Sequence, residues 1–372
     1  MKSRVPAQRE PAPGPARPGR LADRGADPAA PLRHAGVLAT LGRARGAFRS
    51  SSRLEMADAV LRALATAGRM APVARPARHN VEVLRDISYT DSRLRDHTLD
   101  IYRPVSQPGP WPVIMYVHGG GFSLLSKETH WIMGLCFARM GFIVFNISYR
   151  LAPRHPFPTP LEDTCAAYEW VNENAERFGG DLERLAVAGE SAGANLITAL
   201  SVATCYPRPE PFARRVYELG RVPKVALPAC GILQVSDAGR FGRRRRLPTW
   251  VDAVLTNVSR AYLTGVPDGG HALADPLVIL EEGEPPARPL PAFFAPVGTR
   301  DPLLDDTRRL ERALRRLGVP CAARFFHREL HAFHALVWRE SARRCWSETF
   351  GFLARHLDSP RASSGEAAHC AA

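Results

Sequence analysis

Apolar runs of strand length alternate with helix-like stretches from about residue 80 onward. The first two runs are close enough in sequence to pair as a hairpin. The strand-like runs are 81–89 (VEVLRDISY), 97–103 (HTLDIYR), 113–117 (VIMYV), 142–149 (FIVFNISY), 185–189 (LAVAG), 225–233 (VALPACGIL), 293–298 (FFAPVG) and 322–327 (AARFFH).

Several of the later runs are separated by stretches with helical periodicity, such as 161–179 and 306–318. In the second of these, Leu310, Ala313 and Leu314 lie on one face, since they follow the spacing of helical turns. Continuous apolar strands that alternate with amphipathic helices are typical of a mostly parallel sheet covered on both faces. The sequence therefore predicts an α/β fold.

Two further helical patterns, at 54–68 and 250–263, do not belong to this alternation. Before the second lies GRFGRRRRLP (239–248), whose four consecutive arginines indicate an exposed loop. The two helices are interpreted either as additional core helices or as a cap over one end of the sheet. The pattern alone leaves both alternatives open.

Charge is unevenly distributed along the 372 residues, whose formal net charge is +13. Residues 1–54 contain eleven Lys and Arg against three Asp and Glu, and the remainder contains 39 against 34. The globular part is thus nearly balanced, so the charge does not indicate a nucleic-acid partner.

The first fifty residues are rich in Pro, Ala, Arg and Gly and have few large apolar side chains. Such a segment buries too little surface to offset its ordering entropy, so 1–53 is predicted to be a disordered basic tail. It contains no apolar stretch long enough for a secretory signal. Met56 opens a helical pattern and is a second candidate for the translation start. A flexible tail is also predicted at 360–372.

Seven cysteines are scattered through the chain without C-x-x-C pairs, at positions 136, 165, 205, 230, 321, 345 and 370. This usage favours neither a disulfide framework nor a metal site, and it fits a reducing cytoplasm. No run approaches the roughly 20 apolar residues of a membrane span. We expect no stable membrane insertion, although the arginines at 243–246 leave weak association with an acidic surface open.

The motif Gly-Glu-Ser-Ala-Gly (189–193) directly follows the strand-like run LAVAG and precedes a helical stretch. By itself G-x-S-x-G is weak, because a chain of this length contains it by chance about once in ten cases. Its strand–turn–helix setting is that of a nucleophile elbow. Close packing of strand and helix would exclude side chains at Gly189 and Gly193. Ser191 is therefore the candidate nucleophile, and the N–H of Ala192 is a candidate donor to an oxyanion.

A second motif, His118-Gly119-Gly120-Gly121-Phe122, also follows an apolar strand. Glycines allow backbone N–H groups to approach a ligand closely. Attack by a serine nucleophile produces an oxyanion, which needs such donors. The alternative interpretation is a flexible glycine loop, which the downstream elbow disfavours.

The base is expected to be a histidine after the last strand. His327 lies within the last strand pattern, and His334 is expected in the first turn of the final helix. His331 falls in the loop between them, where a side chain can reach the catalytic end of the sheet. His331 is the predicted base.

The acid is expected between the nucleophile and the base, where GTRDPLLDD (298–306) offers three aspartates. Asp301 comes just after a strand, and the following proline favours an extended conformation for it. Asp305 and Asp306 are more simply explained as the cap and first-turn charge of the next helix. Asp301 is the predicted acid, and the order Ser, Asp, His is that of α/β-hydrolases.

These motifs together closely resemble the hormone-sensitive-lipase-like carboxylesterases of the α/β-hydrolase superfamily. The resemblance spans about residues 80–357, and the matching pieces are HGGGF (118–122), SYRLAPRHPFPTPLED (148–163), GESAG (189–193), DPL (301–303) and HAF (331–333). It implies an eight-stranded, mostly parallel sheet with a helical cap, within a domain at 54–359. The cap would come from about 54–78 and 236–268.

The resemblance further implies that the N–H groups of Gly120, Gly121 and Ala192 form the oxyanion hole, with small to medium acyl esters as substrates and no metal or organic cofactor. Two positions depart from the family pattern: Arg154 stands where Glu is usual, and Ala332 where Gly is usual. The second departure bears on the loop that holds His331. Family-like residues with expected roles in packing and loop anchoring are Tyr149, Arg150, His155 and Asp163, and Glu190 is interpreted as a structural hydrogen-bond partner.

The sequence thus predicts a serine carboxylic-ester hydrolase that works through an acyl-enzyme. Ser191 would attack the ester, His331 would take its proton, and Asp301 would orient the imidazole. An amidase, deacetylase or acyltransferase with the same triad, or a non-catalytic small-molecule receptor on the same fold, remains an alternative. Acyl chain length, alcohol and oligomeric state are not indicated by the sequence.

Overall fold

The eight strand-like runs form one sheet in the computed structural model, which describes residues 56, 59, 63, 65–106, 108–244, 246–267 and 269–357. The strands are β1 (Val81–Ser88), β2 (Thr98–Pro104), β3 (Trp111–Val117), β4 (Ile143–Ile147), β5 (Gly180–Glu190), β6 (Val225–Ala229), β7 (Ala292–Gly298) and β8 (Cys321–Phe326). Within these described residues they form a single eight-stranded sheet in the order β1-β2-β4-β3-β5-β6-β7-β8.

The sheet is antiparallel where β1 meets β2 and β2 meets β4, and parallel from β4 to β8. The predicted hairpin and the mostly parallel sheet are both confirmed. Strand β5 begins five residues earlier than its apolar run, because Gly180 and Asp181 pair with Trp111 and Pro112 of β3.

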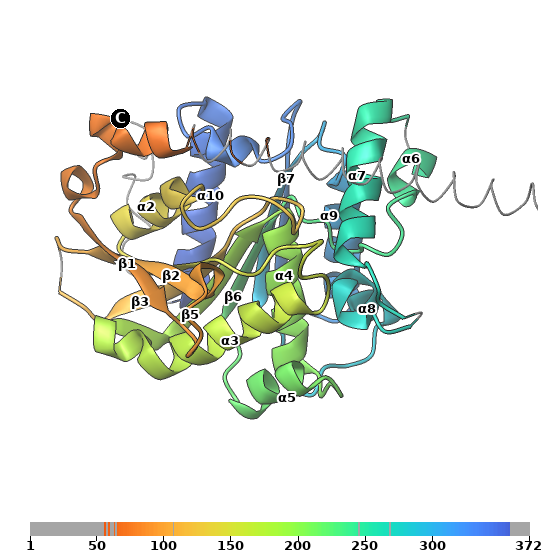
Figure 1. Cartoon of the computed structure of the whole chain (residues 1–372), viewed down its shortest axis with the longest axis horizontal. Helices are drawn as coiled ribbons and strands as arrows, with labels where there is room; N and C mark the ends of the chain where they lie inside the picture. Colours follow the sequence, from red (N-terminus) through yellow and green to blue (C-terminus); the bar gives the residue numbers. More distant parts are fainter. Residues whose placement is uncertain are drawn as a thin grey trace, which may run out of the picture. The chain divides into compact units, whose positions relative to one another are not determined.

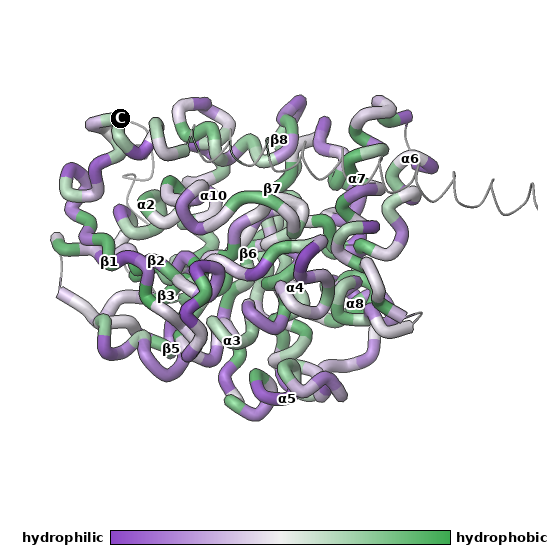
Figure 2. The backbone as a smooth tube through the Cα atoms, in the orientation of Figure 1, coloured by the Kyte–Doolittle hydropathy of each residue, from purple (hydrophilic) through white to green (hydrophobic). Residues whose placement is uncertain are grey.

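Helices cover both faces of the sheet (Figure 1). Helices α2 (Trp131–Arg139) and α10 (Glu340–Leu357) pack on one face, and α3 (Thr159–Asn174), α4 (Ala192–Cys205), α5 (Pro211–Glu218), α8 (Pro276–Glu282) and α9 (Leu304–Arg316) pack on the other. Alternate strand residues therefore enter two separate cores: Val113 and Met115 of β3 face α3 and α4, whereas Ile114 and Tyr116 face α2 and α10. Figure 2 shows the hydrophobic positions concentrated along these central strands.

Two helices follow β6 and lie beside each other at one edge of Figure 1, namely α6 (Arg240–Arg244) and α7 (Thr249–Tyr262). The arginine-rich stretch 239–248 was expected to be an exposed loop, and that expectation is wrong for its first half. Residues 240–244 form a helix, and Arg240 is buried and paired with the carboxylate of Asp306, with its Nε 3.1 Å from Oδ1. Arg243, Arg244 and Arg246 are exposed as expected.

The N-terminal helical pattern at 54–68 is described only in part, and residues 65–70 are helical. Arg69, Ala74 and Pro76 line a small pocket together with Trp131 and Leu135 of α2, so this segment packs beside α2. The predicted tails at 1–53 and 360–372 lie outside the described residues. Among the helices described, none is both long and apolar enough to cross a bilayer.

Candidate active site

Ser191 occupies the sharp turn between β5 and α4. Its backbone has φ 54° and ψ −113°, a sparsely populated region for a residue with a side chain. The surroundings hold this conformation: the N–H of Ser191 donates to Ala229 O at 2.9 Å, and the carbonyl of Ser191 accepts from Asn195 N at 3.2 Å. The turn therefore has the backbone geometry of a nucleophile elbow.

The two glycines of the motif are required by the close packing of the turn on β3. A Cβ on Gly193 would lie 2.1 Å from Val117 O, and a Cβ on Gly189 would lie 2.7 Å from the carbonyl carbon of Gly193. Real atoms do not approach this closely, so no larger residue fits. These distances agree with the steric reason inferred for the G-x-S-x-G spacing.

The glycine-rich loop after β3 approaches the same end of the sheet. Gly120 has φ 110°, and a Cβ there would lie 2.2 Å from Leu124 O, so this position also requires glycine. His118 supports the loop from below, since its ring stacks on Tyr149 at 4.2 Å and its carbonyl accepts from the Tyr149 hydroxyl at 3.0 Å. The loop is thereby fixed close to the turn that contains Ser191.

Helix α7 covers the outer side of this loop. A Cβ on Gly121 would lie 2.8 Å from Cγ2 of Val258, and the ring of Phe122 stacks on Tyr262 with centroids 3.6 Å apart. Ala192 is the first residue of α4, so its N–H has no acceptor within the helix. The backbone at Gly120, Gly121 and Ala192 is thus the candidate donor set.

His331 and Asp301 are paired, as the sequence predicts. Nδ1 of His331 lies 2.9 Å from Oδ2 of Asp301, and the other oxygen of Asp301 accepts from Leu303 N at 2.8 Å. Asp301 is fully buried, whereas the His331 side chain is 37% exposed. Because Nδ1 faces the acid, Nε2 is the ring atom that can exchange a proton with a substrate or a serine.

Cys230 is a neighbour of this pair that the sequence interpretation missed. Its thiol lies against the imidazole of His331, and Ala229, the residue before it, accepts the hydrogen bond from Ser191 N. Segment 229–230 thus connects the serine turn to the histidine. Its position in the sequence could have indicated this role, because Cys230 directly follows β6 at the edge of the sheet where the other motifs lie.

Local charges change the proton affinity of this group. Burial by itself would lower the pKa of His331, but Cys230 and the Asp301 carboxylate outweigh it and raise the pKa well above its ordinary value. Burial raises the pKa of the Cys230 thiol, and the nearby imidazole offsets this only in part.

Among the described residues, the group whose ligand atoms could surround a metal ion is this same one. The atoms of Cys230, Asp301 and His331 lie within 4.8 Å of one another. The close hydrogen bond between Asp301 and His331 already uses one ligand atom from each. The absence of a metal requirement stays a prediction.

The other two histidines considered as bases lie elsewhere. His327 is exposed just beyond the end of β8. His334 was expected in the first turn of the final helix, which is wrong: it lies in a short 3₁₀ turn, Phe333–Ala335, and α10 starts at Glu340. Its Nε2 is 3.0 Å from Oε2 of Glu190, in a buried environment.

Asp305 and Asp306 open helix α9 without capping it through their side chains. Asp306 was interpreted as a first-turn charge, which underestimates its role because it is fully buried. It accepts from the N–H of Leu233 at 2.9 Å and binds the guanidinium of Arg240. Asp306 therefore anchors the segment after β6 to α9.

Of the residues expected to anchor loops, Tyr149, Arg150 and Asp163 do so, whereas the role of the His155 side chain stays a prediction. Arg150 binds the buried carboxylate of Asp163, and Nε2 of His97 lies 3.2 Å from the same carboxylate. Glu190, interpreted as a structural hydrogen-bond partner, indeed faces two histidines, of which His130 was not anticipated.

Comparison with known proteins gives consistent relatives. Residues 114–335 match a family described as having the alpha/beta hydrolase fold. The chain is 31% identical over 261 residues to carboxylesterase NlhH of Mycobacterium tuberculosis, which covers 70% of this chain and 75% of that protein.

Among solved structures, the chain resembles esterase LipW from Mycobacterium marinum with a TM-score of 0.65 and 24% identity, over 82% of this chain and 90% of that chain. It also resembles a hormone-sensitive lipase from a metagenome library, with a TM-score of 0.63 and 22% identity over 82% and 91% of the two chains. At these identities the two structures support the fold alone.

Proposed function

The chain belongs to the hormone-sensitive-lipase-like carboxylesterase family of the α/β-hydrolase fold, and from this membership we propose that it hydrolyses small to medium acyl esters through Ser191, His331 and Asp301. The observation that supports this most directly is the Asp301–His331 pair, which follows the strained serine turn in the chain order of the fold. Carboxylesterase activity itself follows from the family.

In the first half of the proposed reaction, Oγ of Ser191 attacks the ester carbonyl carbon and Nε2 of His331 takes the hydroxyl proton. The carbonyl oxygen becomes an oxyanion, which the N–H groups of Gly120, Gly121 and Ala192 stabilise. The imidazolium then gives its proton to the alcohol oxygen as the ester C–O bond breaks. An acyl-serine and a free alcohol result.

In the second half, water attacks the acyl carbon while His331 takes one of its protons. The acid leaves, and the proton returns to Oγ of Ser191. Throughout, the Asp301 carboxylate holds the proton on Nδ1 and stabilises the positive ring. His118, Gly119, Gly189 and Gly193 support this geometry without touching the reacting atoms.

Helices α6 and α7, within 236–268, are proposed to cap the substrate site. The contact of Val258 with the Gly121 backbone and the stacking of Tyr262 on Phe122 support this, because they bring α7 onto the loop that would hold the oxyanion. The acyl or alcohol group of the substrate would then pack under α7. The contribution of 54–78 to the cap stays a prediction.

The test is a series of p-nitrophenyl esters of increasing acyl length, measured with wild type and with Ser191→Ala. We expect Ser191→Ala to lower kcat by at least about 10⁴-fold with the fold intact. Ser201→Ala is the matched control, because Ser201 lies in the same helix α4 and its hydroxyl donates to Ile197 O at 2.7 Å.

Labelling with an organophosphonate probe separates an enzyme from a binding protein on the same fold. Wild type should be labelled at Ser191, and Ser191→Ala should not. Full esterase activity in Ser191→Ala would place the nucleophile elsewhere and refute the proposal.

A further inference from the structure

The carboxylate of Glu190, the residue before the candidate nucleophile, lies between two histidines from other segments. Nε2 of His130 is 3.0 Å from Oε1 of Glu190, and Nε2 of His334 is 3.0 Å from Oε2. The side chains are buried, with exposed fractions of 7% for His130 and 9% for the other two. Oε1 is thus hydrogen-bonded to His130, whereas Oε2 lies at ion-pair distance from His334 and has no hydrogen-bond partner among the described residues. We call these three residues the Glu190 clamp.

The surroundings of Glu190 favour its ionised form. Burial by itself would raise the pKa of Glu190, but the hydrogen bonds and charges of His130 and His334 lower it well below its ordinary value. Glu190 is therefore an anion. A buried anion depends on its partners, since an unpaired charge away from water is costly.

One side of the clamp is fixed to the loop after β3. Nδ1 of His130 lies 3.2 Å from Ser126 O and 2.9 Å from Oγ1 of Thr129, so the ring is held at both nitrogens. The glycine-rich part of the loop packs on Glu190 as well, because a Cβ on Gly119 would be 3.3 Å from Oε1. The position of Glu190 therefore limits where the candidate oxyanion donors can lie.

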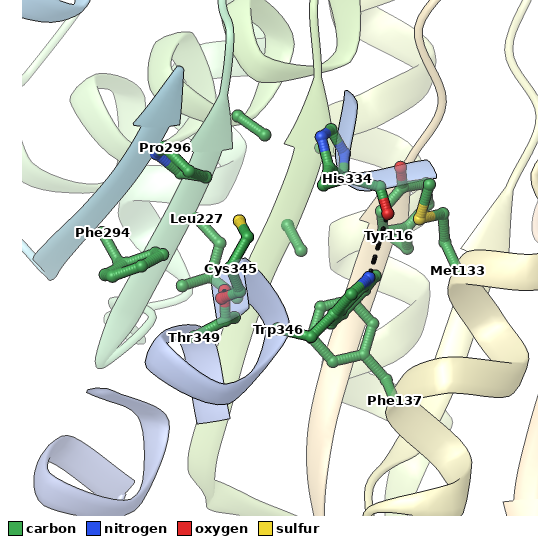
Figure 3. A pocket seen from close by; sticks show the side chains of 13 residues that line it. Tyr116, Met133, Phe137, Leu227, Phe294, Pro296, His334, Cys345, Trp346 and Thr349 are labelled. Atoms are coloured by element: carbon green, nitrogen blue, oxygen red, sulfur yellow. Dashed lines mark hydrogen bonds between the residues drawn. The ribbon is translucent and has the colours of Figure 1, made fainter. Parts of the chain in front are cut away.

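The other side of the clamp is fixed to the loop that contains the candidate base. His334 comes three residues after His331, and its carbonyl accepts from Nε1 of Trp346 in α10 at 3.0 Å (Figure 3). Its ring lies at the edge of a cavity of about 30 Å³, between the sheet and helices α2 and α10. The cavity lining is mainly apolar, with Met133, Phe137 and Phe294 among its residues.

Glu190 itself connects both sides to the nucleophile turn. In β5 its side chain lies on the same face as Ala186 and Ala188, which pack toward α2 and α10. The backbone continues directly into Ser191. One carboxylate therefore contacts the loop of the oxyanion donors and the loop of the base, and it belongs to the strand of the nucleophile.

We propose that Glu190 is a positioning residue for the triad reaction, a role that rests on the function proposed above. Its ionised carboxylate fixes the relative positions of three segments: the glycine-rich loop, the turn with Ser191 and the loop with His331. The reaction requires these positions to be accurate, because a misplacement of a reacting group by about 1 Å can lower the rate about a hundredfold. Glu190 acts through the geometry of these segments and takes no part in proton transfer.

The test is Glu190→Gln, which keeps the size of the side chain and removes its charge. A glutamine has one acceptor oxygen, so only one of the two imidazoles keeps its acceptor. We expect kcat per phosphonate-titrated active site to fall about ten- to a hundredfold. KM should stay within twofold, and the inflection of the pH profile should not move, because the base and its acid are unchanged.

The matched control is Asp163→Asn. Asp163 is also a buried carboxylate with a histidine partner, His97 at 3.2 Å, but it pairs with Arg150 outside the clamp. We expect a lowered melting temperature in both variants. Only Glu190→Gln should also have a lower kcat per titrated site. If Glu190 merely stabilised the fold, both variants would keep their kcat per titrated site.

A value of kcat per titrated site within twofold of wild type in Glu190→Gln would overturn the proposal. If that variant does not fold, His334→Gln replaces it and the same criterion applies. The wild-type probe experiment keeps the two proposals apart: unlabelled Ser191 refutes the triad, whereas a labelled Glu190→Gln variant with normal turnover refutes only the clamp.

Discussion

Two carboxylate–histidine pairs lie at the catalytic edge of this protein, and their histidines are three residues apart in sequence. His331 presents Nδ1 to Asp301 at 2.9 Å, whereas His334 presents Nε2 to Glu190 at 3.0 Å. The His331 side chain is 37% exposed and that of His334 is 9% exposed. The same two residue types thus form pairs with opposite access to solvent.

This difference indicates which of the two pairs can transfer a proton to and from a substrate. In the Asp301 pair, Nδ1 of His331 faces the acid, which leaves Nε2 as the ring nitrogen that can take and give a proton. In the Glu190 pair, Nε2 of His334 faces the Glu190 carboxylate, and the imidazole is buried beside an apolar cavity. The two histidines therefore differ in ring orientation and in exposure, and these differences make His331 the candidate base and His334 a partner of the positioning residue Glu190.

The largest expected effect comes from substituting each of the two histidines in turn. His331→Gln should lower kcat by about 10⁴-fold or more, since the base is lost. His334→Gln should lower kcat by about ten- to a hundredfold, since only positioning is disturbed. Steady-state kinetics at matched folded fractions, checked by circular dichroism, measure both. Equal losses would show that the two pairs do not differ in role.

The second expected effect concerns pH. A base is active when it is unprotonated, so kcat/KM should rise as pH increases through the pKa of His331, which lies above its ordinary value. Asp301→Asn removes a carboxylate that raises this pKa, so the inflection should move to lower pH while kcat falls about 10⁴-fold. Residual kcat/KM measured across pH checks this. An inflection that stays in place would mean that Asp301 does not set the proton affinity of the base.

The smallest expected effect concerns Ala332, which lies between the two histidines. Its φ of 53° is left-handed, a conformation that disfavours a residue with a Cβ. Ala332→Gly should therefore raise the free energy of unfolding by about 0.5–1 kcal/mol, with turnover retained. Ala335→Gly, in the 3₁₀ turn that follows Ala332, is the control and should lower the free energy of unfolding. Urea denaturation measures the free energy of unfolding of both variants. A lower value for Ala332→Gly than for wild type would contradict backbone strain at Ala332.

Much of the fold could be predicted from the sequence, because strand and helix periodicities are local. All eight strand-like runs appear as strands, and helices α3, α7 and α9 appear where the patterns indicated. The boundaries differ where pairing extends a strand beyond its apolar run, as at Gly180 of β5. The arginine-rich stretch was misread because Asp306, the partner that buries Arg240, lies 66 residues away.

The candidate triad could also be predicted, since each of its members follows a strand at one edge of a parallel sheet. What local pattern could not supply was the partner of each side chain. His130 and His334 lie far from Glu190 in sequence, and Cys230 is one of seven scattered cysteines. These contacts depend on which loops the sheet order brings together.

The sequence by itself determined the succession of strands and helices along the chain and the glycines of the serine turn, because these follow from periodicity and sterics. It also predicted Asp301 and His331 as candidates from chain order, and the two side chains are paired in the structure. The tertiary structure alone decided which nitrogen of each histidine meets an acid, which carboxylates are buried and which helix lies over the glycine-rich loop. The physical reason is that hydrogen bonds and burial are set by distances in space between residues that are remote along the chain.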